Sequence, residues 1–189
     1  MVAAYLAGRQ PYSLKIVPYH KREFQYDVYA GEVTFEEWHE KRGLPADTPL
    51  PRDLAADEIR IDLAGFVAER LYYCSDRIDV LDPDLRLGWY RQSFSDYALI
   101  STALFTITGD IDNLNDIAAR KPRAELESPF NRAFQRIADE TWDLLSIPKH
   151  WRAVTALASA ALDHESLSGE EIVAILQPIL GPVGCSRYG

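Results

Sequence analysis

Near the N-terminus, apolar and polar residues follow the two-residue alternation of strands. Residues 12–18 and 24–29 alternate in this way, and Pro11 precedes the first of them. Before them, residues 1–7 are rich in Ala and Leu and predict a short helix that ends at Gly8. This part of the chain therefore predicts a β-hairpin or small sheet that follows a short helical segment.

From Asp53 onward, the apolar residues take the spacing of helices. The first segment runs to about Tyr72 and is apolar on more than one side, which predicts a central helix that is largely buried. Four further helices are expected, over residues 95–108, 110–119, 129–145 and 149–162. A last helix begins at Ser168, has Glu171 in the capping-box position and runs to about Leu176.

Two polar stretches interrupt this pattern and predict loops. Residues 31–53 contain three prolines, and the one short helix expected there would begin at a capping box formed by Thr34 and Glu37. Residues 74–92 contain the turn sequence Asp82-Pro83-Asp84.

Together, these segments predict an α+β fold, mostly α. A small N-terminal β-hairpin or sheet would be followed by a helical bundle. The length of 189 residues suits one domain. We expect that domain to span residues 1–180, with a flexible tail over residues 181–189.

Composition limits the partners that this fold is expected to have. Hydrophobic residues make up 47% of the chain and charged residues 26%, as in soluble globular proteins. The net charge is −9 and no cluster of Lys and Arg dominates, which argues against a nucleic-acid partner. No apolar run is long enough for a transmembrane helix, and Cys74 and Cys185 form neither a disulfide framework nor a CxxC pair. We therefore expect a cytoplasmic protein without a membrane or nucleic-acid partner, and leave open a protein or peptide partner and the oligomeric state.

The histidines are the first candidates for metal chemistry, but their spacing argues against it. There are four, and no two lie three or four residues apart: His20, His39, His150 and His164. The segment from His39 begins like the His-Glu-x-x-His zinc motif but has Gly43 where the second histidine must fall. The chain also lacks a phosphate-binding GxxxxGK[ST] or GxGxxG loop and a GxSxG nucleophile elbow. By these residues alone, no activity can be assigned.

Four segments, in order, resemble a known family. Residues 2–18 resemble the stretch after the zinc motif of FtsH-type peptidases, where a helix runs to a Gly and is followed by a strand ending near a Pro. Ile61-Asp-Leu-Ala-Gly-Phe-Val-Ala-Glu69 looks like the family's Ala-Gly-x-x-Ala-Glu helix, and Ser93-Phe-Ser-Asp96 resembles its Ser-x-Asp helix start. Residues 167–172 are similar to its closing Leu-x-Gly-Glu-Glu-Ile turn. The likeness is to a stand-alone peptidase-like form, since the Walker motifs of the family's ATPase half are absent.

This resemblance implies a zinc site that the chain does not complete. In such peptidases two histidines hold zinc, the glutamate between them activates water, and the aspartate of the Ser-x-Asp segment is the third ligand. Asp96 corresponds to that third ligand. Alignment on Gly8 places both histidines and the glutamate before Met1, so we expect no catalytic residue and no bound zinc in the chain as it stands. A carboxylate such as Asp96 is also favoured at a helix start without any metal.

Three hypotheses follow. The chain is a zinc-metallopeptidase relative with a truncated active site, a relative that serves as a non-catalytic helical protein-interaction module, or an unrelated helical protein with a similar pattern. The first two imply that the Asp96 carboxylate faces the N-terminal end of the helix at residues 1–7, with residues 64–69 packed nearby. Ala64 and Gly65 would then be small residues that let helices approach closely.

Overall fold

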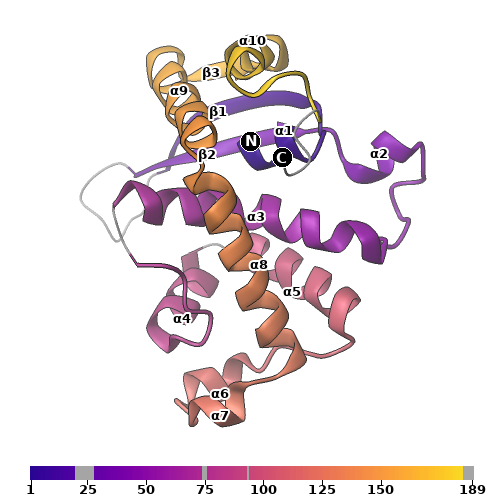
Figure 1. Cartoon of the computed structure of the whole chain (residues 1–189), viewed down its shortest axis with the longest axis vertical. Coiled ribbons are helices and arrows are strands. Elements are labelled where there is room, and N and C mark those ends of the chain that lie inside the picture. Colours follow the sequence, from indigo (N-terminus) through magenta and orange to yellow (C-terminus); the bar gives the residue numbers. More distant parts are fainter. Residues whose placement is uncertain (20–27, 74–75, 93, 185–189) are drawn as a thin grey trace. The chain divides into compact units, whose positions relative to one another are not determined.

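The computed structural model describes residues 1–19, 28–73, 76–92 and 94–184, which form two compact units. Unit 1 combines residues 1–48 with residues 147–189, and unit 2 is the continuous segment 49–146. The α+β, mostly α class is confirmed (Figure 1). That residues 1–180 form one domain stays a prediction, and residues 185–189 of the expected tail lie outside the described part.

Unit 1 contains a three-stranded antiparallel sheet in the order β2-β1-β3. Its strands are β1 (Pro11–Tyr19), β2 (Val28–Phe35) and β3 (Ser166–Ser168), which lie side by side in Figure 1. In register, Leu14 on the central strand pairs with Val33 on one side and with Leu167 on the other. The N-terminal sheet is thus completed by a strand from the far end of the chain, which sequence patterning did not predict.

The first predicted strand is confirmed, and residues 28–29 of the second lie in β2. Residues 24–27 of the predicted 24–29 strand lie outside the described residues, and β2 continues through Phe35. The predicted cap at Thr34 is therefore wrong, because Thr34 is a strand residue. The helix α2 (Trp38–Arg42) instead has Glu37 at its N-cap, and Glu37 exchanges capping hydrogen bonds with Glu40.

The helices α9 (Pro148–His164) and α10 (Gly169–Leu180) pack against β1. As predicted, Ser168 caps α10: its hydroxyl accepts from the Glu171 N–H at 3.3 Å, and the Ser168 N–H donates to the Glu171 carboxylate at 2.8 Å. The hydrogen bonds from Ser168 lower the pKa of Glu171. The capping box therefore sets the start of α10 directly beyond the end of β3.

Gly169, the first residue of α10, touches the central strand. A Cβ atom at this position would lie 2.3 Å from the carbonyl oxygen of Pro11 and 3.2 Å from that of Tyr12. Since both neighbours are backbone atoms, no side-chain rotation relieves the overlap. The glycine of the Leu-x-Gly-Glu-Glu-Ile turn is therefore required by the close approach of α10 to β1.

The helix α1 (Val2–Leu6) is buried along its whole length. The α-amino group of Met1 is also buried, although the residue as a whole keeps partial exposure. Burial lowers the pKa of this amine from 8.0 to about 6, because a charged ammonium is poorly solvated inside the protein.

For a chain that begins at Met1, we expect unit 1 to lose stability as the pH falls from 8.0 to about 6. In this interval the unfolded chain binds a proton at the amine that the folded chain does not bind, so acid favours unfolding. A pKa difference of two units corresponds to about 2–3 kcal/mol in the free energy of unfolding. This stability is fully present above the pKa of the amine in the unfolded chain and fully lost below its pKa in the folded chain. Urea unfolding across this range measures the effect. N-terminal acetylation should remove it, and an unchanged pH slope in the acetylated chain would contradict the prediction.

In the described residues of unit 2, the regular elements are all helices. Its helices are α3 (Arg52–Tyr72), α4 (Pro83–Gln92), α5 (Phe94–Thr108), α6 (Leu114–Ala118), α7 (Arg123–Leu126) and α8 (Pro129–Ser146). The three long helices α3, α5 and α8 pack against one another (Figure 1). They bury Ile59 and Leu63 from α3, Ile100 and Leu104 from α5, and Ile137 from α8. The long helices are thus the ones that hydrophobic spacing predicted.

Helix α4 falls within residues 74–92, so the prediction of a loop there is wrong. Its Trp89 stacks on Phe66 of α3 with ring centroids 5.0 Å apart, and lies 5.9 Å from Phe134 of α8. Pro83 is tolerated because it occupies the first helical position, where no backbone N–H is needed. The packing of Trp89 against α3 and α8 therefore stabilises a helix that the turn sequence Asp82-Pro83-Asp84 did not predict.

The expected role of Gly65 is not borne out either. Ala64 is buried, as close packing requires, but Gly65 is exposed. Among the described residues, nothing lies within 4 Å of a Cβ placed at Gly65. Of the two small residues in the Ala-Gly-x-x-Ala-Glu segment, only Ala64 is in a packed position.

Candidate functional site

Asp96, the one predicted metal ligand, lies in the first turn of α5 in unit 2. It is partly exposed, and it accepts a hydrogen bond from the Ser95 hydroxyl at 3.3 Å. No cation pairs with it in the part of the chain that the structure describes. The α-helix dipole favours its negative charge at this end. Because the helix at residues 1–7 belongs to the other unit, the predicted approach of Asp96 to that helix stays a prediction.

The described histidines are not arranged as metal ligands. His39 lies in α2, and Gly43 ends that helix in the left-handed conformation, with φ of 65°. His150 is buried in α9, and His164 is the last, exposed residue of that helix. His20 lies outside the described residues. Within the described ranges, no group of three or more His, Cys, Asp or Glu residues could hold a metal ion.

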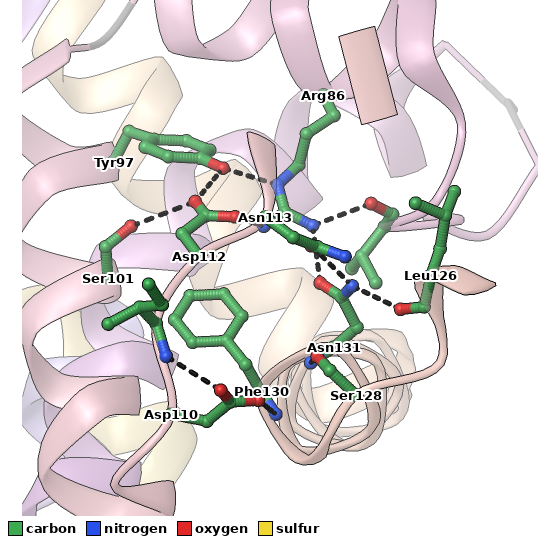
Figure 2. A network of polar contacts seen from close by, with 12 residues as sticks. Arg86, Tyr97, Ser101, Asp110, Asp112, Asn113, Leu126, Ser128, Phe130 and Asn131 are labelled. Carbon is green, nitrogen blue, oxygen red and sulfur yellow. Dashed lines mark hydrogen bonds and ion pairs between the residues drawn. The ribbon is translucent and has the colours of Figure 1, made fainter. Parts of the chain in front are cut away.

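A buried polar cluster in unit 2 is one that the sequence did not reveal. Its centre is Arg86 of α4, whose side chain has no exposed surface. Three other segments supply its side-chain partners, as Figure 2 shows: α5, the loop before α6, and α8. We call Arg86, Tyr97, Asp112, Asn113 and Asn131 the Arg86 network.

The guanidinium group of Arg86 contacts several groups at once. It pairs with Asp112 at 2.7 Å, and donates to the Val80 carbonyl at 2.8 Å and to the Asn131 side-chain oxygen at 3.2 Å. Its Nε donates to the Tyr97 hydroxyl. The guanidinium also lies over the ring of Phe134, 4.7 Å from the ring centroid. A buried charge with this many partners is well compensated.

The partners of Arg86 are tied to each other as well. The Tyr97 hydroxyl donates to the second oxygen of Asp112. Burial raises the pKa of Tyr97, and the charge of Asp112 adds to the rise while that of Arg86 opposes it, so the phenol stays protonated and can donate. The Asn131 amide donates to the Asn113 side chain at 2.8 Å and to the Leu126 carbonyl at 2.6 Å.

This arrangement is typical of a structural polar core. Its donors and acceptors are directed at one another, and the ion pair is almost enclosed, with 0% exposure for the Arg86 side chain and 16% for Asp112. A catalytic group needs a face open to substrate. The Arg86 network therefore joins α4, α5 and α8 and fixes the position of α5, on which Asp96 lies.

A pocket of about 190 Å³ opens beside the network. It is lined by Val80, Leu81, Arg123, Glu127, Asn131, Arg132 and Gln135. Sites for small molecules usually enclose roughly 300–1,000 Å³. Much of its polar lining is already engaged, since Gln135 donates to the Ile78 carbonyl at 2.7 Å and Arg123 pairs with Asp79 at 2.8 Å. Its size and its engaged side chains do not indicate a ligand.

Comparison of the chain with known proteins found no matching family model, no matching curated protein and no matching solved structure. Among the described residues, no helix is both long and apolar enough to cross a membrane.

Proposed function

We propose that the chain is a relative of the FtsH-type peptidase domains that is not catalytic as it stands. The proposal rests on the ordered resemblance of its segments. The observation that carries it is the position of Asp96, an aspartate without a cationic partner among the described residues, in the first turn of a long helix. That helix packs against α3, which contains the Ala-Gly-x-x-Ala-Glu segment.

In this proposal Asp96 corresponds to one ligand of the family's zinc site, and the two histidine ligands are not among residues 1–189. One carboxylate does not hold zinc at useful affinity, because zinc sites in proteins use three or four protein ligands. Hydrolysis further needs a general base beside the metal-bound water. A zinc-dependent hydrolase therefore requires a His-Glu-x-x-His segment in addition to the residues of this chain.

The test is to add that segment. An untagged chain extended by His-Glu-x-x-His directly before Met1 should bind about one zinc ion, whereas the chain as it stands should bind none in stoichiometric amount. Replacing Asp96 with asparagine in the extended chain should weaken zinc binding at least tenfold, because a charged ligand is lost. Competition with a chromogenic chelator measures these affinities.

A matched control is available within unit 2. Asp84 also lies in the first turn of a helix, and its side chain is 79% exposed. The Asp84→Asn change should leave the zinc affinity of the extended chain unaltered. If the extended chain binds zinc equally well with and without Asp96, the proposed relationship to the peptidase site is wrong.

A second function, binding of a protein partner without catalysis, is favoured by a different observation. The exposed side of α5 has large apolar side chains, Leu99 and Phe105, and Asp96 is the only charged residue in this helix. Helices that face water normally carry charges on that side. An uncharged, exposed side is characteristic of surfaces that another protein covers.

A further inference from the structure

The outer edge of β2 is unpaired in unit 1. β2 is an outer strand of the three-stranded sheet and is bonded on one side to β1 (Figure 1). Among the described residues, no other strand pairs with it. An unpaired edge presents a row of backbone N–H and C=O groups to which an extended chain can add as a further strand.

The register of the sheet shows which residues of β2 direct their backbone groups to this edge. The Ile16 N–H donates to the Glu165 carbonyl at 2.8 Å, on the β3 side of β1. Ile16 therefore does not bond to Gly31, the residue opposite it in β2. In an antiparallel pair this alternates along the strand, so Gly31 and Val33 direct their N–H and C=O groups away from β1.

The C-terminal part of β2 keeps the same alternation. The Glu36 N–H donates to the Gln10 carbonyl at 2.7 Å, so the backbone groups of Phe35 also face outward. In the part of the chain that the structure describes, the N–H and C=O groups of Gly31, Val33 and Phe35 have no hydrogen-bond partner. With one donor and one acceptor each, these three residues offer up to about six hydrogen bonds to an added strand.

The charge along this edge is negative. Residues 28–40 contain four glutamates and no Lys or Arg: Glu32, Glu36, Glu37 and Glu40. Within the described ranges, none of the four is in an ion pair, although Lys15 lies opposite Glu32 in the sheet. Three of these carboxylates lie close together at the C-terminal end of β2, because they follow Phe35 within five residues and α2 begins among them.

We propose that the outer edge of β2 binds an extended peptide segment with basic residues, as an added antiparallel strand. The backbone groups of the edge select an extended chain, and the glutamates select a basic one. A second copy of this chain, paired through its own β2, would double the glutamates at the edge without adding a cation. The inference goes beyond the peptidase relationship, since it does not involve Asp96.

The two faces of β2 predict the side chains of the added strand. Val33 and Phe35 are half-buried, whereas Glu32 and Thr34 on the opposite face are exposed. A residue that bonds to the backbone of Val33 places its side chain on the same face as Val33. Residues of the peptide whose N–H groups face the edge should therefore be apolar, and those between them polar.

A fluorescein-labelled peptide, Lys-Lys-Val-Thr-Val-Thr-Val, tests the proposal by fluorescence anisotropy with the full chain. In the antiparallel alignment its lysines lie at the Glu36 end of β2 and its valines bond to the outward residues. We expect a dissociation constant on the order of 10–100 μM, because backbone hydrogen bonds contribute modestly when they replace bonds to water. A peptide with Glu-Glu in place of Lys-Lys should bind at least tenfold more weakly.

N-methylation tests the strand geometry without changing the protein. Methyl groups on the three valine nitrogens should weaken binding at least tenfold, because these N–H groups face β2. Methyl groups on the two threonine nitrogens, which face solvent, should leave the affinity within about twofold. Equal losses from the two modifications would overturn the proposed strand addition.

Substitutions in the chain test the charge. Glu36→Gln should weaken binding of the basic peptide about two- to fivefold. Glu170→Gln is the matched control, because Glu170 is exposed in the first turn of α10, outside β2, and should leave the affinity unchanged. No binding up to about 1 mM peptide, or equal binding of the Glu-Glu peptide, overturns the proposal. A dimer of the chain that the peptide dissociates would assign the edge to a second copy and overturn it as well. None of these measurements involves zinc, so failure here is distinguishable from failure of the peptidase relationship.

Discussion

Replacing Arg86 with methionine should lower the free energy of unfolding of unit 2 by about 3–5 kcal/mol. The substitution removes the cation but leaves Asp112 almost buried, with 16% of its side chain exposed. An uncompensated buried charge is costly, and the carbonyl of Val80 also loses its donor. Hydrogen exchange of amides in α5 and α8 measures the loss within unit 2.

Two comparisons separate this effect from a simple loss of charge. Arg120→Met removes an exposed ion pair with Asp84, whose side chain is 79% exposed, and should cost less than about 1 kcal/mol. Arg86→Lys keeps the charge but not the planar fork that reaches several acceptors, so it should still destabilise unit 2. If Arg86→Met costs no more than Arg120→Met, the network does not stabilise the fold as inferred.

Gly169→Ala should destabilise unit 1 by at least about 2–3 kcal/mol. The added Cβ would lie 2.3 Å from the Pro11 carbonyl oxygen, so the start of α10 must move away from β1. Thermal unfolding followed by circular dichroism measures the loss, and hydrogen exchange of the β1 amides locates it in unit 1.

The control is another helical glycine with open space around it. Gly65→Ala in α3 meets nothing within 4 Å among the described residues, and it should raise the stability of unit 2 by about 0.5–1 kcal/mol through helix propensity. Equal effects of Gly169→Ala and Gly65→Ala would show that contact with Pro11 is not the cause.

Sequence patterns predicted those parts of the fold whose determining residues lie close together in the chain. The capping box of Ser168 and Glu171 was found from sequence because both partners lie within one turn. The long helices α3, α5 and α8 were found because their apolar residues recur at helical spacing and are buried against one another. In these cases local preference and tertiary packing agree.

The parts that sequence patterning missed depend on contacts between distant segments. Strand β3 is only three residues long and is defined by its pairing with β1. Its own three residues do not predict that pairing. The Arg86 network joins four segments that are far apart in the chain. The sequence around Arg86 is polar, so it did not predict that this arginine is buried. At Asp96 the chemistry could be predicted only as a resemblance, and the structure adds its position at the start of α5.

The two units draw on different parts of the chain, and this sets an order for their folding during synthesis. Unit 2 is one uninterrupted stretch, whereas unit 1 needs both ends of the chain. Strand β1 obtains its partner β3 only after the whole intervening segment has been made. During synthesis, unit 2 can therefore fold while the N-terminal strands still lack one edge of their sheet. Until β3 emerges, this edge of β1 lacks its partner and can pair with another chain, which favours aggregation.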